Sequence, residues 1–231
     1  MTSDSSGELG REDHWIPLAD LMTGLMLVFM LLAISFMYKI HEDTRRAAVI
    51  YDQMRNSLYR DLFNEFKRDL PLWGATLDKN LTIRFDSPRI MFDAGRSDLK
   101  PKFKFILTDF FPRYLRILSE PKYQSSIEEI RIEGNSSSVW SAAETSDDAY
   151  FKNMQLSQDR ALSTLNYVLK LSEVSDDADW LKSHVTAVGL SSSKPVKSNG
   201  VENASASQRV EFRVRTNADD RLKEIFEMFR R

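Results

Sequence analysis

The residue best suited to proton chemistry is Asp20, the single acid in the apolar stretch from Trp15 to Tyr38. An ionised carboxylate costs roughly 2.5–3.5 kcal/mol at the middle of a membrane and less near a helix end, where Asp20 lies. An apolar environment disfavours the charged form, so a buried aspartate there can load and release a cation near neutral pH. Asp20 is therefore a candidate ion carrier. The alternative is an aspartate that caps the helix or lies among lipid headgroups.

A second candidate site is formed by Asn153 and Arg160. The two residues are seven positions apart, which is two turns of a helix, so both side chains lie on one face. The planar guanidinium of an arginine can hold a carboxylate with two parallel hydrogen bonds. This spacing indicates that the two residues can address one ligand. The alternatives are that Asn153 is a helix N-cap and that Arg160 is a surface ion-pair partner.

Other chemistry is poorly supported. His14, His41 and His184 are scattered without a second ligand at metal spacing, so no metal site is expected. The absence of cysteine excludes thiolate ligands, cysteine nucleophiles and disulfides. The sequence contains neither a glycine-rich phosphate loop nor a serine and histidine in a recognisable catalytic arrangement. We therefore expect no enzymatic activity and no cofactor.

Asp20 must be positioned by a membrane helix. At about 1.5 Å per residue, the stretch from Ile16 to Tyr38 reaches about 34 Å, enough to cross a membrane once. Trp15 and Tyr38 are suited to the two interfaces, and Pro17 fits the first turn. No cleavage pattern of a signal peptide follows, so we expect the helix to remain as an anchor.

Thr23 and Gly24 share the side of this helix that carries Asp20. Small and polar residues allow other helices to approach closely, which makes these two the expected neighbours of an ion path. The whole chain has a mean hydropathy of −0.39, which indicates that most of it faces water. Its net charge of −2 and pI near 6.0 give no electrostatic case for nucleic-acid binding.

The chain of 231 residues has room for one span, a connector and one ordinary domain. Residues 39–70 have apolar positions at helical spacing and predict a helix, which Pro71 and Gly74 should end. This helix either packs on the domain as a spacer or pairs with a second copy. The expected divisions are a tail (1–14), a transmembrane helix (15–38), a helical linker (39–78), a folded domain (79–217) and a C-terminal helix or tail (218–231).

The folded domain should be α+β, a mixed sheet with helices on one face. Alternating or β-rich patterns predict strands at Leu81–Phe85, Arg89–Phe92, Ile130–Gly134, Val185–Gly189 and Arg209–Arg215. Helical patterns cover Phe103–Leu115, Asn153–Leu171 and Arg221–Phe229. A kink or a break is expected in the first of these at Pro112. Polar segments at 135–150 and 191–207 predict surface loops.

The run from Pro17 to Met26, Pro-Leu-Ala-Asp-Leu-Met-Thr-Gly-Leu-Met, resembles the membrane segment of MotB-like stator subunits. Within that group, the Leu-Met-Thr-Gly-Leu-Met motif and the short chain length are most similar to the subunits of Zorya-type anti-phage defence systems. In the family the matching aspartate carries the proton that drives rotation, a role that falls here on Asp20. The resemblance also implies a self-dimer surrounded by five MotA- or ZorA-like multi-spanning ring subunits in a bacterial inner membrane.

The resemblance implies a cytoplasmic N-terminus and a periplasmic C-terminal domain. The flanking charges favour the opposite, because only Arg11 precedes the span, whereas Lys39, Arg45 and Arg46 follow it. We follow the resemblance. In flagellar relatives an amphipathic segment after the span acts as a plug, and whether residues 39–70 do so here stays open beside the spacer alternative.

The domain resembles the OmpA-like peptidoglycan-binding family over about residues 81–215. The matching pieces are Met91-Phe92-Asp93-Ala94-Gly95 with Leu99, Gly134, Asn153-x-x-Leu156-Ser157-x-x-Arg160-Ala161, Gly189 with Lys194-Pro195-Val196, and Gln208-Arg209-Val210-Glu211. The resemblance implies that Arg160 holds a carboxylate of the diamino acid in the peptidoglycan stem peptide. It adds Asn153, Leu156 and Arg209 to the binding residues.

One family feature is missing. Relatives commonly have Gly-His-Thr-Asp after the strand, and their aspartate also contacts the ligand, whereas this chain has Gly134-Asn135-Ser136-Ser137. Asp147 or Asp148 is a candidate replacement from the following loop. The resulting hypothesis is a proton-driven rotary motor subunit for anti-phage defence that is anchored to peptidoglycan. A passive peptidoglycan tether and a flagellar-type stator are the alternatives, and the choice between proton and sodium stays open.

Overall fold

The computed structural model describes residues 15–141 and 143–217. They belong to two compact units that divide between Ala47 and Ala48, and each unit is described by itself. The expected N-terminal tail (1–14) and the expected helix at 221–229 lie outside the described residues.

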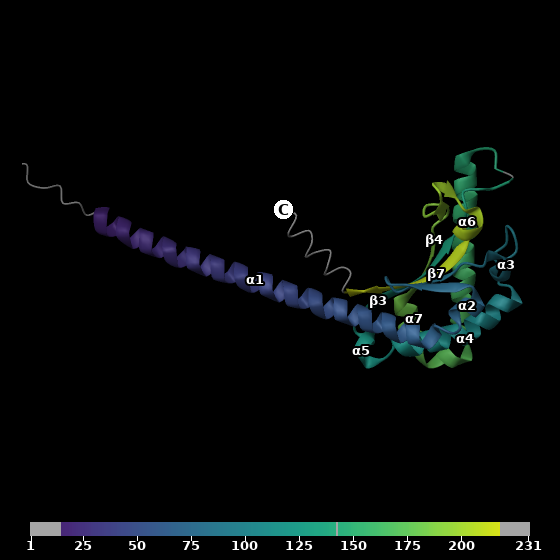
Figure 1. The fold of residues 1–231 in the computed structure, drawn as a ribbon, viewed down its shortest axis with the longest axis horizontal. Helices are drawn as coiled ribbons and strands as arrows, with labels where there is room; N and C mark the ends of the chain where they lie inside the picture. The colour runs from purple at the N-terminus through teal and green to yellow at the C-terminus, as the bar shows by residue number, and fades with distance from the viewer. Residues whose placement is uncertain (1–14, 142, 218–231) are drawn as a thin grey trace, which may run out of the picture. The chain divides into compact units, whose positions relative to one another are not determined.

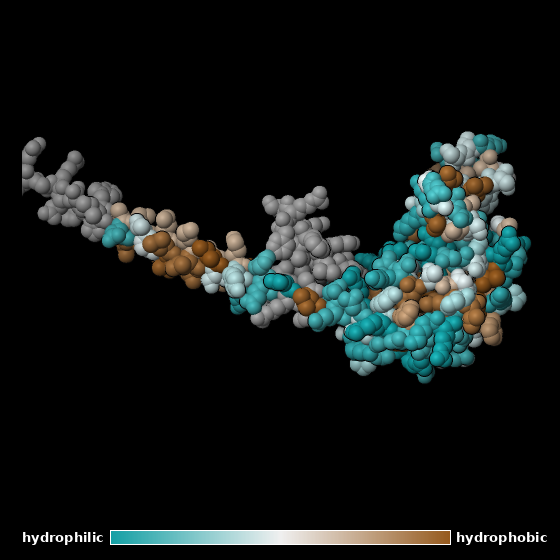
Figure 2. Space-filling model, viewed as in Figure 1, coloured by the Kyte–Doolittle hydropathy of each residue, from teal (hydrophilic) through white to brown (hydrophobic). Residues whose placement is uncertain are grey.

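The first unit contains the start of α1 (Trp15–Phe66). Its Ala19–Glu42 segment has a mean hydropathy of 2.2 and is the one described helix long and apolar enough to cross a membrane. Figure 2 shows this segment as a brown, apolar band. Its large apolar side chains are exposed, from Leu21 to Met37. Such a surface is stable only against lipid or against other apolar helices.

In the second unit, the last turns of α1 pack on the folded domain. Leu58, Leu62 and Phe66 are fully buried in its core. Charged contacts add to this packing, since Asp61 accepts hydrogen bonds from Lys122 Nζ (2.7 Å) and Tyr123 Oη (2.7 Å). The spacer interpretation therefore holds for this part of the helix, because its apolar stripe is already covered.

The end of α1 differs from the prediction. The helix stops at Phe66, and Pro71 lies in the first turn of a separate short helix, α2 (Leu70–Trp73). Gly74 ends α2 with a φ of +61°, a left-handed conformation that favours glycine. A proline thus opens a helix where the sequence pattern suggested that it closes one, because its missing N–H is not needed in the first turn.

The domain contains a five-stranded sheet in the order β1-β2-β7-β3-β4. Only β3 and β4 are parallel, and the other neighbours are antiparallel, which confirms the expected mixed sheet. The strands are β1 (Ala75–Asp78), β2 (Thr82–Phe85), β3 (Ile127–Asn135), β4 (Val185–Gly189) and β7 (Arg209–Thr216). A separate two-stranded ribbon pairs β5 (Lys197–Ser198) with β6 (Val201–Glu202).

The helices of this domain are seen beside the sheet in Figure 1. They are α3 (Pro88–Met91), α4 (Pro101–Leu118), α5 (Pro121–Gln124), α6 (Ser146–Val168), the 3-10 helix η1 (Ser172–Asp177), α7 (Ala178–His184) and α8 (Ala204–Ser207). Because α6, η1 and α7 connect the parallel strands β3 and β4, they form a β-α-β crossover.

The two faces of the sheet have different side chains. Along β7, Val210, Phe212 and Val214 alternate with charged residues and point into the core. The Phe212 ring lies 5.1 Å from that of Phe110 in α4 and 5.9 Å from that of Phe85 in β2, centroid to centroid. The helices therefore cover the apolar face, as the sequence predicted.

Four local predictions were wrong. The segment 191–207 is not all loop, because it contains the β5–β6 ribbon and α8. Arg89–Phe92 is not a strand, because Pro88 starts the short helix α3 there. Pro112 does not break α4, since buried side chains on both sides, including Phe111 and Tyr114, hold the helix in place. The segment 135–150 is not all loop, because α6 already begins at Ser146.

Candidate functional site

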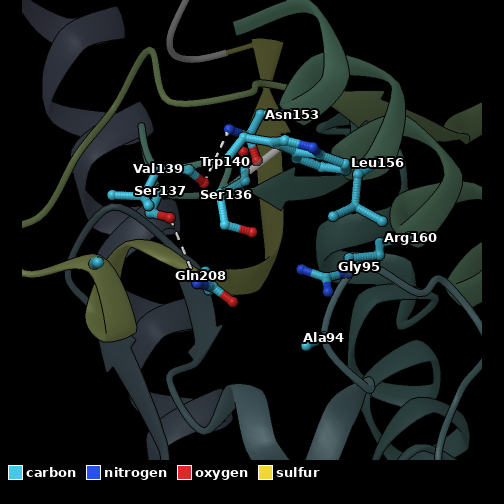
Figure 3. Close-up of a pocket in the computed structure, with 12 residues that line it drawn as sticks. Ala94, Gly95, Ser136, Ser137, Val139, Trp140, Asn153, Leu156, Arg160 and Gln208 are labelled. Atoms are coloured by element: carbon cyan, nitrogen blue, oxygen red, sulfur yellow. Dashed lines mark hydrogen bonds between the residues drawn. The ribbon is translucent and has the colours of Figure 1, made fainter. Parts of the chain in front are cut away.

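A cleft of about 550 Å³ opens where the α6 helix passes the C-terminal end of β3. Figure 3 shows its lining side chains. They are Ala94, Gly95, Ser136, Ser137, Val139, Trp140, Ser141, Asn153, Leu156, Arg160, Ala204 and Gln208. The cleft therefore brings together three of the four predicted wall-binding residues, from one helix, with loop residues far away in the sequence.

Two glycines allow α6 to lie directly on the sheet. A Cβ atom on Gly134 would lie 2.1 Å from the backbone oxygen of Ser157, and one on Gly189 would lie 2.5 Å from the backbone nitrogen of Gln158. The Gln158 side chain closes the contact, because its Oε1 accepts from the Gly189 N–H (2.6 Å) and its Nε2 donates to the Ala187 carbonyl (3.2 Å). This close approach places the α6 side chains next to the C-terminal ends of β3 and β4.

Arg160 is almost fully buried, with 6% of its surface exposed. Its Nε donates to the carbonyl of Arg96 (2.9 Å), one terminal nitrogen donates to the carbonyl of Asp93 (3.2 Å), and the guanidinium lies 4.9 Å from the centre of the Phe92 ring. Within the described part of the chain, Arg160 forms no ion pair with a carboxylate. The alternative of a surface ion pair is therefore wrong.

Burial also changes the acid–base behaviour of this arginine. Desolvation lowers the pKa of Arg160 to about 10, because burial penalises its charged form. The group is still cationic at neutral pH, and Figure 3 shows its guanidinium pointing into the cleft. A desolvated cation without an acidic partner is a strong attractor for an anionic ligand.

Asn153 lies within α6, not at its N-terminus. The N-cap is Thr145, whose side chain accepts from the Asp148 N–H, so the N-cap alternative for Asn153 is wrong. Asn153 is 3% exposed, and its Nδ2 donates to the carbonyl of Val139 (3.4 Å). This bond ties the loop after β3 to the helix, next to Leu156 in the cleft wall.

Several lining residues were not predicted. Ser136 and Ser137 belong to the expected surface loop, yet both are buried, because the chain continues past β3 between α6 and the segment that precedes β7. The Gln208 Nε2 lies 3.5 Å from Ser137 Oγ, and Figure 3 shows this link across the cleft. The position of these serines in the family pattern was the available signal. Trp140 had no signal of its own.

Arg209 does not line the cleft. Its Nε bonds Glu211 Oε1 at 2.6 Å, and its terminal nitrogens donate to the carbonyls of Ser207 (3.1 Å) and Lys194 (3.1 Å). These bonds hold the end of the 190–208 loop against β7. The structure thus gives Arg209 a supporting position, apart from the other three predicted residues.

Neither candidate replacement acid reaches the cleft wall. Asp148 pairs with Lys152 Nζ at 2.8 Å, Asp147 is exposed, and neither is among the lining residues. Among the described residues, no group of three or more histidine or acidic side chains could hold a metal ion.

The other predicted site lies in the first unit. Asp20 is exposed on the surface of α1, and Thr23 Oγ1 donates to the Ala19 carbonyl (2.8 Å) within the same helix. A Cβ atom on Gly24 would meet nothing within 4 Å. The described chain thus leaves this side of the helix open to partners.

Comparisons with known proteins agree with this architecture. The OmpA family matches residues 91–209. The Zorya protein ZorB of Escherichia coli is 42% identical over 220 residues, which cover 93% of each protein. The crystal structure of a MotB like protein from Desulfovibrio vulgaris is 21% identical, covers 75% of this chain and 99% of that chain, and gives a TM-score of 0.50. The similarity to the MotB like protein is evidence for a shared fold only.

Proposed function

The chain belongs to the family of the Zorya protein ZorB and carries an OmpA family domain, and on that premise we propose that it is the peptidoglycan-anchored membrane subunit of a proton-driven rotary motor in anti-phage defence. The observation that carries the proposal is that one chain has both Asp20 in an apolar helix long enough to cross a membrane and Arg160 buried in a cleft without an acidic partner among the described residues. It is a mechanical rather than an enzymatic role.

Asp20 is the proposed proton carrier, with Thr23 and Gly24 beside it. The apolar segment of α1 has no cover within its own unit, and a carboxylate in that setting needs polar neighbours from other subunits. We propose MotA- or ZorA-like multi-spanning ring subunits, five around a dimer of this chain. Each proton that passes releases about 2.3 kcal/mol per 100 mV of membrane potential.

The folded domain is the proposed wall anchor, with Asn153, Leu156 and Arg160 at the ligand and Arg209 supporting the loop behind them. Arg160 would hold a stem-peptide carboxylate, because it is desolvated, cationic and free of an internal acid. This requires a cytoplasmic N-terminus and a periplasmic C-terminal domain in the inner membrane. Without a fixed anchor, the core of the motor would turn with the ring and transmit no torque.

The decisive experiment replaces Asp20 with asparagine in cells that carry the complete defence system. Asn keeps the size of the side chain but cannot carry a proton at neutral pH. We expect phage protection to fall to the level of cells without the system, while co-purification with the ring subunits stays intact. The control is Asp179→Asn, whose side chain is fully exposed on α7.

The outcomes separate the candidate functions. Full protection in the Asp20→Asn strain would contradict the motor and favour a passive tether that needs only the cleft. A flagellar-type stator would instead change swimming and leave phage plating unaffected. Replacing the proton gradient with a sodium gradient in vesicles distinguishes the transported ion.

A further inference from the structure

Among the residues that the structure describes, the lining of the cleft proposed for wall binding contains one cation and no acid. Of its twelve lining residues, Arg160 is charged and the rest are apolar or neutral polar side chains. This inference rests on the proposed function, since it concerns which form of the stem peptide the cleft prefers. A diamino acid offers a carboxylate and an amino group, and the cleft supplies a counter-charge for only the first.

Nearby carboxylates are already engaged. Glu202 accepts hydrogen bonds from the backbone N–H (3.1 Å) and hydroxyl of Ser138, which lower its pKa against the opposing effect of burial. Asp93 lines an adjoining hollow of about 270 Å³, where its carboxylate is 2.9 Å from Lys100 Nζ. A ligand ammonium in the main cleft would therefore lose water without gaining an ionic partner.

The polar groups of the cleft match an amide better than an ammonium. The Ser136 hydroxyl is buried without a hydrogen-bond partner in the described structure, and Figure 3 shows it pointing into the cleft. The Ser137 and Gln208 side chains also line the cleft and are neutral hydrogen-bond donors and acceptors. Such groups can serve both the N–H and the carbonyl of an amide, while Val139 and Trp140 offer apolar surface for its acyl carbons.

We propose that this cleft binds stem peptides whose diamino acid carries an acylated side-chain amine at least as readily as those with a free amine. Arg160 holds the carboxylate, and the Ser136, Ser137 and Gln208 side chains meet the neutral amide. An acylated amine is the chemistry of a cross-link between two stem peptides. The anchor would accordingly accept the load-bearing, cross-linked part of the wall.

The test uses the purified full-length chain in lipid nanodiscs and isothermal titration calorimetry. The probes are two synthetic stem peptides that end in a diamino acid, identical except that its side-chain amine is free in one and acetylated in the other. We expect the acetylated peptide to bind as tightly or tighter.

Ser137→Asp supplies the missing counter-charge. We expect this variant to prefer the free amine by at least about tenfold, as a close, partly desolvated ion pair should. Ser137→Asn is the matched control, with the size of aspartate but no charge, and it should show no preference for the free amine. Arg160→Gln should lose both peptides, because both need the carboxylate contact.

Tighter binding of the free-amine peptide than of the acetylated peptide by the unmodified chain would overturn the proposal. If Asp93→Asn then abolished that preference, the ammonium would be assigned to the adjoining hollow. Binding of neither peptide, together with no retention on purified peptidoglycan, would overturn the wall-anchor function itself. The two failures are therefore distinguishable.

Discussion

Two arginines of this domain are equally buried, and their partners give them different roles. Arg160 and Arg209 each expose 6% of their surface. Arg209 pairs with Glu211 at 2.6 Å, so its charge is compensated inside the protein. The charge of Arg160 meets only carbonyl groups and the face of Phe92. A cation held in this way is poised for a carboxylate from outside.

The lowered pKa of Arg160 gives a prediction about pH. Because burial lowers that pKa only to about 10, the guanidinium keeps its charge below pH 9, and affinity for a carboxylate peptide should be flat from pH 6 to 9. A lysine in the same place starts from a lower ordinary pKa, about 10.4, and the same burial would lower that pKa toward neutral pH. We expect Arg160→Lys to bind more weakly and to lose affinity as pH rises from 7 to 9.

Calorimetric titration of the full-length chain at pH 6, 7, 8 and 9 measures both profiles. Arg68→Gln, at an exposed position of the domain, is the control and should follow the unmodified chain. A flat profile for Arg160→Lys would mean that position 160 is less desolvated than its surroundings indicate.

At the scale of elements, the site depends on how closely α6 lies against β3 and β4. Gly134→Ala should push the helix away, because the new Cβ would lie 2.1 Å from the Ser157 oxygen. We expect a loss of about 3 kcal/mol in the free energy of unfolding, with weaker peptide binding. Urea denaturation measures the first quantity. In Gly24→Ala, where a Cβ meets nothing within 4 Å, the unfolding of the domain should be unchanged.

The junction of α1 with α4 depends on Arg113. Its guanidinium bonds Glu65 (2.8 Å), Asp69 (2.8 Å) and Asp109 (3.0 Å) and lies 5.0 Å from the centre of the Phe66 ring. This arrangement fastens the end of the long helix to the domain, so that force applied to one is passed to the other.

We expect Arg113→Met to reduce the free energy of unfolding by about 2 kcal/mol, because Asp69 would be left partly buried without a counter-charge and Glu65 would keep only Arg116, 3.3 Å away. Arg116→Met is the control, since that side chain is 69% exposed and should contribute less than about 0.5 kcal/mol. Equal stabilities in urea would show that apolar packing alone holds the junction.

At the scale of the whole molecule, the main question is orientation. Lys39, Arg45 and Arg46 argue for a cytoplasmic domain, whereas wall binding requires a periplasmic one. The chain has no cysteine, so a single Val201→Cys, at a position 71% exposed, reports its side of the membrane. We expect a membrane-impermeant maleimide to label it in cells with a permeabilised outer membrane. Ser3→Cys should be labelled only after lysis, and the reverse pattern would contradict the proposed anchor.

Elements with strong local signals can be predicted from short stretches of the chain. The apolar stretch of α1 follows from its length and hydropathy, and β4, β7 and α4 follow from periodicity, because each depends on neighbours along the chain. The resemblance to the OmpA-like family also indicates Asn153, Leu156 and Arg160 from the sequence.

Tertiary structure decided what those residues face. Ser136 is buried and Arg160 lacks an acid, because strands and loops more than 40 residues apart meet at the end of the sheet. Such meetings carry no local periodicity. Packing also keeps α4 continuous through Pro112, because the buried aromatic contacts of the helix outweigh the loss of the hydrogen bond that the proline removes.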